Sequence, residues 1–249
     1  IMFYIKMADL LICIDNHYEY VKNMCRDYIV EPEAVCSEST EPAHADMYIQ
    51  VSCEEIEKEQ EESRKSQGIE YPMPYCESIC IYRSISRKLI NFDGLLLHGA
   101  CIEMDGKVYV FCAKSGTGKS THLALWKKVY GSRVHIINGD KPIIRYVDGQ
   151  FIVYGTPWSG KEGWNINTKA PLAAVCYLKR GESNQIHSFA AGEAVKLIVN
   201  QILLPKDKSE IIRYLDLLDK MLKDIPGYEL FCNMDEEAAV VAYEGMKFS

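Results

Sequence analysis

The stretch Ala113-Lys-Ser-Gly-Thr-Gly-Lys-Ser-Thr121 decides which fold this chain is expected to adopt. It follows the phosphate-binding P-loop pattern of Gly, four residues, then Gly-Lys-Ser/Thr, except that Ala113 stands at the first glycine position. Gly116 and Gly118 permit the tight turn in which successive backbone N–H groups face one anion. The pattern predicts a phosphate-binding loop followed by a helix, whose positive N-terminal end attracts the same anion.

The sequence on either side of the loop has the order that a P-loop needs. Lys107–Cys112 is rich in β-forming residues, and apolar residues recur at helical spacing over Leu123–Val129, before a predicted helix stop at Gly131. A strand, a glycine-rich loop and a helix therefore follow one another. This order favours the P-loop over the alternative, a Gly/Ser turn that merely precedes a helix.

Each polar residue of the loop has an expected role. Lys119 is expected to contact the β and γ phosphates of a nucleoside triphosphate, and the Ser120 hydroxyl is expected to bind Mg²⁺. ATP and magnesium are the cofactors that this chemistry implies. The residues predicted to bind the nucleotide are Ser115, Gly116, Thr117, Gly118, Lys119, Ser120 and Thr121.

A second metal ligand is expected at Asp140, because P-loop enzymes hold Mg²⁺ with an acid on a neighbouring strand. Asp140 follows Lys119 across one predicted helix and one short strand, Val134–Ile137. Such a crossover brings the acid to the same sheet edge as the P-loop. The alternative is an ordinary turn residue beside Gly139 and Pro142, and the spacing favours metal binding.

His98, Lys141 and Lys161 are the other candidate site residues. His98 lies on a predicted strand next to the P-loop strand, and Gly99 after it permits close approach of two backbones. A histidine among apolar residues is often an ordinary core residue, so both interpretations stay open. Lys141 and Lys161 lie in nearby loops, where each either neutralises a phosphoryl group or is a solvated surface residue.

Strand and helix patterns alternate along the chain, which predicts an α/β fold with a mixed sheet. Two Asp-Gly turns predict antiparallel hairpins, the first of which leads into the P-loop. Near the N-terminus, Phe3–Ile14 is expected to be a strand, and Glu54–Lys65 either an exposed helix or a mobile loop. The hairpin strands are predicted over Leu95–Met104 with Lys107–Cys112, and over Ile143–Val147 with Phe151–Tyr154.

Two parts of the chain are expected, a small N-terminal α/β region over residues 1–74 and a P-loop kinase-like domain over 75–249. They form either separate domains or one continuous domain. In the second part, Asp207 is expected to cap a helix. The inner face of that helix is predicted to carry Ile211, Leu215, Leu218 and Leu222.

The composition of the 249 residues is that of a soluble globular protein, with 48% hydrophobic and 25% charged residues. The net charge of −7 argues against nucleic-acid binding, which needs a basic face. No apolar run is long enough to span a membrane, and Ile1–Ile14 is interrupted by charges, which favours a core strand over a signal peptide. These features predict a cytoplasmic protein that binds neither nucleic acid nor membrane.

The ten cysteines are scattered along the chain. The closest pair, Cys76 and Cys80, has helical spacing and no second pair at the distance typical of a zinc site. Free thiols in a reducing compartment are favoured over a metal site, which stays open as the alternative.

The motifs together resemble one family of P-loop proteins. A Leu-His-Gly hairpin, then Ser-Gly-Thr-Gly-Lys-Ser, then an acid shortly afterwards is similar to the HPr kinase/phosphorylase and phosphoenolpyruvate carboxykinase type. The similarity covers about residues 77 to 204 and is greatest to uncharacterised HPr-kinase-like proteins of Firmicutes. The stretches that carry it are Ser115–Trp126, Asn138–Pro142 and Tyr154–Lys161.

The resemblance implies a kinase-like ATP site on a mixed sheet, with the antiparallel hairpin leading into the P-loop and His98 in the active site. In HPr kinases the strand after the P-loop helix ends in two adjacent Asp residues, one for the metal and one to assist the attacking hydroxyl. Here Gly139 replaces the first of them, and only Asp140 remains. Nucleotide and metal binding are still expected, and His98 or Asp140 is then expected to supply the base for phosphoryl transfer.

Two functions are expected from these residues. The first is an ATP-dependent kinase that phosphorylates a hydroxyl of a protein, a peptide or a small molecule, with the Trp158–Lys161 loop shaping the acceptor pocket. The second is a nucleotide-binding protein without turnover, a sensor or a partner's subunit, which Ala113 and Gly139 favour. A metal-dependent carboxykinase comes third, because its further His and Lys ligands find no match here. The resemblance to oligomeric HPr kinases raises the expectation of self-association.

Overall fold

Strands and helices alternate along the chain, as the sequence patterns predict. A computed structural model describes residues 1–31, 44–189, 191–205 and 207–248, and Cys36 lies outside them. The chain forms two compact units, Ile1–Lys88 and Leu89–Ser249. Compactness does not test independent folding, so the division between residues 74 and 75 stays a prediction. Among the described residues, no helix is long and apolar enough to cross a membrane.

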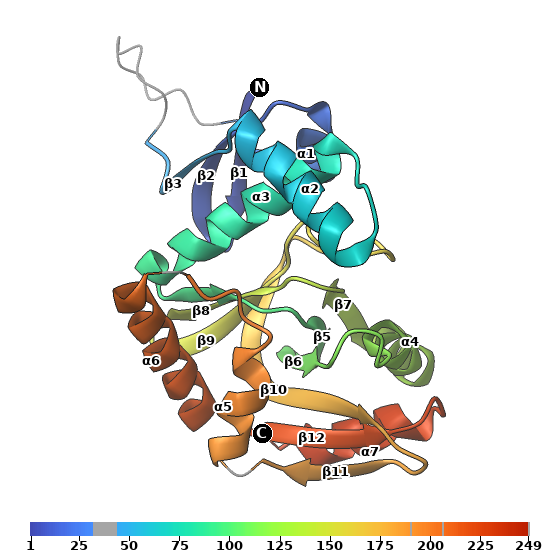
Figure 1. Ribbon diagram of the computed structural model, residues 1–249. Helices are drawn as coiled ribbons and strands as arrows, with labels where there is room; N and C mark the ends of the chain where they lie inside the picture. The colour runs from blue at the N-terminus through green and yellow to red at the C-terminus, as the bar shows by residue number, and fades with distance from the viewer. Residues whose placement is uncertain (32–43, 190, 206, 249) are drawn as a thin grey trace. The chain divides into compact units, whose positions relative to one another are not determined.

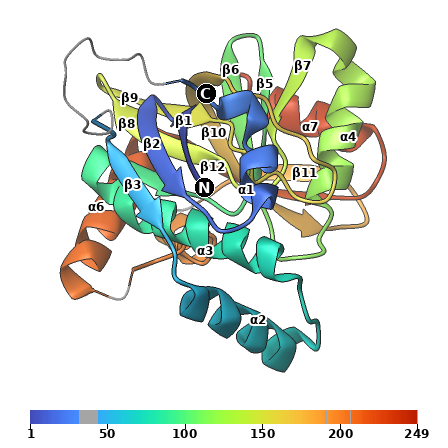
Figure 2. The ribbon, with the colours of Figure 1, turned by 90° about the horizontal axis from the view of Figure 1, so that it is seen from above.

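The first unit contains a three-stranded sheet in which β2 lies between β1 and β3 (Figure 2). Strand β1 is the antiparallel hairpin partner of β2, and β3 runs parallel to β2. The strands are β1 (Met2–Met7), β2 (Leu10–Asp15) and β3 (Met47–Gln50), and the helices are α1 (Glu19–Met24), α2 (Cys53–Gln67) and α3 (Met73–Lys88).

The prediction of one strand over Phe3–Ile14 is wrong, because the segment turns back on itself. Ala8 and Asp9 form the turn with φ angles of 55° and 60°. Positive φ is uncommon outside glycine. Apolar residues continue on both sides of this turn, so nothing in the hydrophobic pattern marks it.

The charged segment Glu54–Lys65 is a helix, which decides between the two predicted alternatives. A capping box begins it: the Glu55 N–H donates to Ser52 Oγ at 3.2 Å, and the Ser52 N–H donates to the Glu55 carboxylate at 2.8 Å. Gly68 ends the helix in the left-handed conformation, with φ at 70°. Local caps therefore define this helix, although its charges do not distinguish it from a loop.

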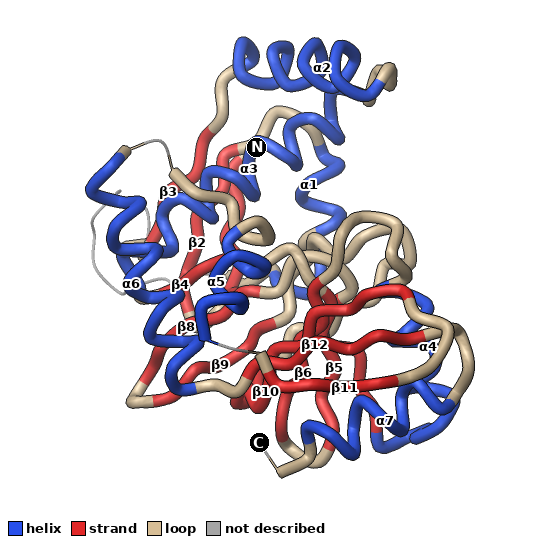
Figure 3. Tube along the Cα trace, turned by 60° about the horizontal axis from the view of Figure 1, so that its bottom comes forward, coloured by secondary structure: helices blue, strands red, loops and turns tan. Residues whose placement is uncertain are grey.

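The second unit is built on a curled mixed sheet of nine strands, with α-helices packed beside it (Figures 1 and 3). The predicted α/β fold with a mixed sheet is confirmed at this level. The strands are β4 (Gly94–Leu96), β5 (Ala100–Met104), β6 (Lys107–Cys112), β7 (Val134–Asn138), β8 (Ile143–Val147), β9 (Gln150–Tyr154), β10 (Lys169–Arg180), β11 (Gln185–Ser188) and β12 (Gly227–Cys232). The helices are α4 (Lys119–Tyr130), α5 (Ala191–Val199), α6 (Lys208–Asp224) and α7 (Glu237–Met246).

The strand order is β4-β8-β9-β10-β6-β5-β7, and β12 joins β10 to β11 beside this path. Both predicted hairpins form, β5 with β6 and β8 with β9. However, Leu95–Met104 is two strands rather than one, and the first of them, β4, pairs with β8. The polypeptide leaves the sheet between β4 and β5, at His98 and Gly99.

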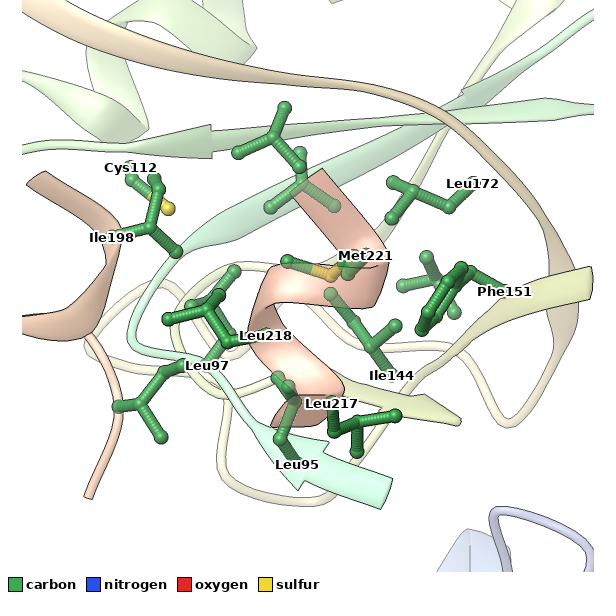
Figure 4. Close-up of a cluster of buried hydrophobic side chains, with 14 of the residues drawn as sticks. Leu95, Leu97, Cys112, Ile144, Phe151, Leu172, Ile198, Leu217, Leu218 and Met221 are labelled. Atoms are coloured by element: carbon green, nitrogen blue, oxygen red, sulfur yellow. The ribbon is translucent and has the colours of Figure 1, made fainter. Parts of the chain in front are cut away.

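Helix α6 buries one face in the hydrophobic core on one side of this sheet (Figure 4). The predicted inner face is wrong in part: Leu218 is buried, whereas Leu215 is 38% exposed. Two overlapping stripes of apolar residues have helical spacing here, and the bulky Tyr214 and Met221 occupy the core. The buried residues of the helix are Tyr214, Leu217, Leu218 and Met221.

Strands β6 and β7 flank β5 and run antiparallel to it, so they are parallel to each other. Helix α4 connects them. The loop after β6 and the turn after β7 therefore lie at the same edge of the sheet, which is the predicted crossover. This edge contains the candidate site.

Candidate functional site

The glycine-rich loop forms the sharp turn between β6 and α4. Gly116 and Gly118 have φ angles of 77° and 117°, which only glycine adopts without strain. Helix α4 begins at Lys119, and within the described part of the chain no side chain caps it at Gly118. Its first-turn N–H groups thus meet the geometric requirement for an anion site. Ala113, at the first glycine position, is fully buried in the core, where its methyl group fits.

Asp140 lies in the turn after β7 and binds two cationic side chains. Its Oδ1 lies 3.2 Å from His98 Nε2, and its Oδ2 accepts a hydrogen bond from Lys141 Nζ at 2.8 Å. Burial opposes ionisation of this carboxyl, but the His98 hydrogen bond and the Lys141 charge outweigh it and lower the pKa of Asp140 to about 2. Asp140 is therefore an anion over the whole physiological range.

Lys119 faces the same carboxylate. Burial lowers the pKa of Lys119, and the negative charge of Asp140 partly offsets that effect. The structure thus brings Lys119, His98, Asp140 and Lys141 together, although Lys119 and His98 come from opposite sides of the β5–β6 hairpin in the sequence. Of the predicted loop cations, Lys141 belongs to this group.

Asn138 shapes the turn that holds Asp140. Its side chain is fully buried, and its Oδ1 accepts the N–H groups of Asp140 at 2.8 Å and Lys141 at 2.6 Å. Its Nδ2 donates to the Thr156 carbonyl at 2.8 Å, and the Thr156 hydroxyl donates to the Lys141 carbonyl at 2.7 Å. These bonds fix the backbone on which the carboxylate stands.

The backbone also holds His98 in place. The His98 N–H donates to the Gln201 carbonyl at 2.7 Å, and the Gly99 N–H donates to the Asp140 carbonyl at 3.0 Å. A Cβ atom at Gly99 would lie 3.0 Å from the Phe111 carbonyl oxygen, so glycine permits the close approach that the sequence suggested. His98 is consequently fixed at the base of the P-loop.

Gly139 stands where HPr kinases are expected to carry an acid, and the space for a side chain there is filled. A Cβ atom at this position would lie 2.7 Å from the Ser159 carbonyl oxygen, a distance that real Cβ atoms do not reach. The Gly139 N–H donates to the Trp164 carbonyl at 2.9 Å. The segment after β9 therefore packs directly on this glycine and excludes a side chain.

The same segment carries Trp158 and Lys161, which the sequence assigns to the acceptor pocket. Trp158 is only 7% exposed and belongs to the core of the loop. Lys161 lies in the exposed turn that follows Gly160. A Cβ atom at Gly160 would be 3.3 Å from Asp140 Cβ, so this turn adjoins the carboxylate. The assignment of Lys161 to catalysis stays a prediction.

Arg180 is a site residue that sequence reasoning missed. It is the last residue of β10, and its Nη2 donates to the Gly116 carbonyl at 2.6 Å. Sixty-four positions separate the two residues in the chain. Only the parallel pairing of β10 with β6 brings them together, so no local signal could have identified the contact.

The site lies at an open sheet edge rather than in the hollows of this unit. Two hollows of about 490 and 590 Å³ adjoin the segment after Gly163, and their linings include neither Lys119 nor Asp140. The first is lined by Glu103, Gly106, His135, Ile166, Thr168, Lys169, Ala170 and Pro171, and the second by Ala124, Lys127, Lys128, Ile136, Gly163, Trp164, Asn165 and Ile166.

The oxygen donors at this edge fit Mg²⁺, which usually takes one or two protein oxygens and completes its shell with phosphate oxygens and water. Ser120 lies in the first turn of α4, and the ionised Asp140 adjoins it through Lys119. Across the described residues, no three His, Cys, Asp or Glu side chains gather closely enough to form a metal site of their own. The described cysteines, Cys76 and Cys80 among them, are free.

Comparison with known proteins gives a family match over most of the chain. Residues 73–236 match the family described as "ScmC: SynChlorMet cassette protein ScmC". No curated protein matches the chain. Among solved structures, it is similar to the Hpr(Ser) kinase/phosphatase from Coxiella burnetii, with 12% identity and a TM-score of 0.30, over 52% of this chain and 88% of that one. A likeness this distant carries no argument, and the relation to a Firmicutes subgroup stays a prediction.

Proposed function

The chain belongs to the ScmC family of SynChlorMet cassette proteins, and from this premise we propose that it is an ATP-binding, kinase-like protein that phosphorylates a hydroxyl group. One observation carries the proposal: the glycine-rich loop with Lys119 and the turn with Asp140 lie at one sheet edge, and the two side chains interact. A P-loop kinase needs this pairing of a phosphate-binding lysine with a carboxylate.

In the proposed complex, the backbone N–H groups of the loop and of the first turn of α4 bind the β and γ phosphates. The Lys119 ammonium neutralises part of their charge. Partial burial makes this ammonium a stronger partner for phosphate, because water competes less for it. Ser115 and Thr117 add hydroxyl donors along the same loop.

Ser120 and Asp140 would hold Mg²⁺, which in such a site neutralises charge on the phosphate oxygens. The Ser120 hydroxyl lies in the first turn of α4, next to Lys119 in the chain. The Asp140 carboxylate is anionic and keeps lone pairs that His98 and Lys141 do not use. Both residues supply the hard oxygen donors that this ion prefers.

His98 is the better base for the acceptor hydroxyl. A carboxyl with a pKa of about 2, as Asp140 has, accepts a proton poorly at neutral pH. Because this carboxylate only accepts hydrogen bonds, Nε2 of His98 must carry the proton that it donates, and a neutral imidazole then has its lone pair on Nδ1. Asp140 thus orients His98 and favours the charged imidazolium that forms when Nδ1 takes a proton. Lys141, and Lys161 in the adjoining turn, would neutralise charge on the transferred group.

A second candidate function is nucleotide binding without turnover. The packing of the Ser159 carbonyl against Gly139 favours it, because this packing excludes the acid that HPr kinases carry there. The chain would then serve as an ATP sensor or as a partner's subunit. The phosphoryl acceptor, self-association, a cytoplasmic location and the relation to HPr kinases belong to the proposal in either case.

The two functions differ in whether ATP is consumed. The experiment incubates the purified chain with Mg·ATP, follows ADP formation, and screens seryl peptides and small hydroxyl compounds for labelling by γ-phosphate. We expect labelling that Lys119→Ala and His98→Ala both abolish. ATP binding without labelling of any acceptor would refute the kinase and support the second function. Labelling that survives Lys119→Ala would refute the proposed site.

A further inference from the structure

We propose that Arg180, at the end of β10, supplies a further cation to the polyphosphate, an inference that rests on the nucleotide site proposed above. Its guanidinium donates from Nη2 to the carbonyl of Gly116, at the tip of the glycine-rich loop. The residue therefore lies beside the bound phosphates rather than elsewhere on the surface. Neither the P-loop pattern nor the family match assigns it a role.

The sheet places Arg180 at this edge. Strand β10 runs parallel to β6, with Leu172 opposite Val108 and Tyr177 opposite Cys112, the last residue before the loop. Continuing in the same direction, β10 ends at Arg180. Parallel strands present their carboxyl ends at one edge, so the loop after β6 and the end of β10 are neighbours, as Figure 1 shows for the two strands.

The charge of Arg180 needs an anion that its present contact does not supply. The Gly116 carbonyl is a neutral acceptor and uses one of several guanidinium N–H donors. The preceding residue, Lys179, pairs with the Glu229 carboxylate, whereas Arg180 forms no ion pair with any residue that the structure describes. Arg180 is also exposed at the sheet edge, so an incoming phosphate can reach it.

Arginine suits this task for reasons of geometry. The guanidinium is planar and always charged, and it presents parallel N–H donors that match two phosphate oxygens at once. The hydrogen bond to Gly116 holds it in position before the ligand arrives, which reduces the entropy lost on binding. Because the arginine and the loop come from different strands, bound polyphosphate would also join β10 to α4.

The test separates the charge of Arg180 from its role as a brace for the loop. Binding of Mg·ATP is titrated calorimetrically against wild type, Arg180→Gln and Arg180→Lys at low and high salt. Glutamine can still donate to the Gly116 carbonyl but carries no charge, whereas lysine keeps both functions. We expect Arg180→Gln to weaken binding by about tenfold to a hundredfold with a shallower salt dependence, and Arg180→Lys to recover most of the affinity.

Lys179→Gln is the matched control, because it removes the adjacent charge from the same strand, and we expect it to bind Mg·ATP as wild type does. Wild-type affinity in Arg180→Gln would overturn the role of Arg180, since the charge would then be dispensable. That failure is distinct from failure of the nucleotide site: in the first case wild type binds and Lys119→Ala does not, whereas in the second wild type itself does not bind. Thermal melting of each variant checks that it is folded.

Discussion

A side chain at position 139 should destabilise the fold, because the structure leaves no room for it. Gly139→Ala adds one methyl group, whose carbon would start 2.7 Å from the Ser159 carbonyl oxygen and 3.7 Å from Trp164 Cβ. The nearest atom belongs to the backbone, so no rotation of a side chain can relieve the contact. The Ser159 segment must move, and the hydrogen bond from the Gly139 N–H to the Trp164 carbonyl, 2.9 Å long, is strained or lost.

The magnitude follows from these two effects. Overpacking of a tight site typically costs about 1–3 kcal/mol, and loss of one backbone hydrogen bond costs about 0.5–1.5 kcal/mol. We therefore expect the free energy of unfolding to fall by about 2–4 kcal/mol. For a unit of this size, each kcal/mol shifts the melting temperature by about 2–4 °C, so the variant should melt about 5–15 °C below wild type.

Differential scanning calorimetry measures this difference. Gly192→Ala is the control, because a Cβ atom there meets nothing within 4 Å and the residue lies in α5. It should melt at or slightly above the wild-type temperature, since alanine favours helix over glycine. A Gly139→Ala melting temperature within about 1 °C of wild type would refute the close packing of the Ser159 segment on this glycine. Gly139→Asp should be destabilised at least as much, so restoring the acid is not expected to raise turnover.

Three further predictions concern stability. Asp140→Asn should lower the free energy of unfolding by about 1–2 kcal/mol at pH 7, because the folded pKa of about 2 lies below the ordinary 3.8; this difference in urea denaturation should shrink as the pH falls from about 4 to about 2. Burial lowers the pKa of His122 to about 3 from 6.5, so wild type should lose up to about 1.4 kcal/mol per pH unit below pH 6.5; His122→Gln should remove that slope, and an unchanged slope would contradict the assignment. Ser52→Ala should cost about 1 kcal/mol by removing the capping box of α2, and wild-type stability in this variant would show that the box is dispensable.

Local patterns predicted the elements around the site. The glycine-rich loop, its strand and helix, and both Asp-Gly hairpins depend on residues close together in the sequence, where turn chemistry and periodicity are informative. The crossover rule then placed Asp140 near the P-loop. The order of these elements therefore follows from sequence, because each rests on a signal that tertiary packing did not override.

Features that depend on distant residues could not be predicted. Arg180 reaches Gly116 only because β10 lies next to β6, and nothing near either residue indicates that pairing. Position 139 reads as a missing acid, whereas the structure shows the Ser159 carbonyl packed against it. On α6, two apolar stripes overlap, and only the packing of bulky residues such as Tyr214 decides which is buried.

The central claim is that the glycine-rich loop binds a nucleoside triphosphate, and calorimetric titration with Mg·ATP tests it most directly. Three proteins are compared: wild type, Lys119→Ala, and Lys114→Ala, which removes an exposed lysine of the same loop. We predict saturable binding by wild type and by Lys114→Ala, and loss of binding in Lys119→Ala. Absence of binding to wild type, or equal binding to wild type and Lys119→Ala, would contradict the claim.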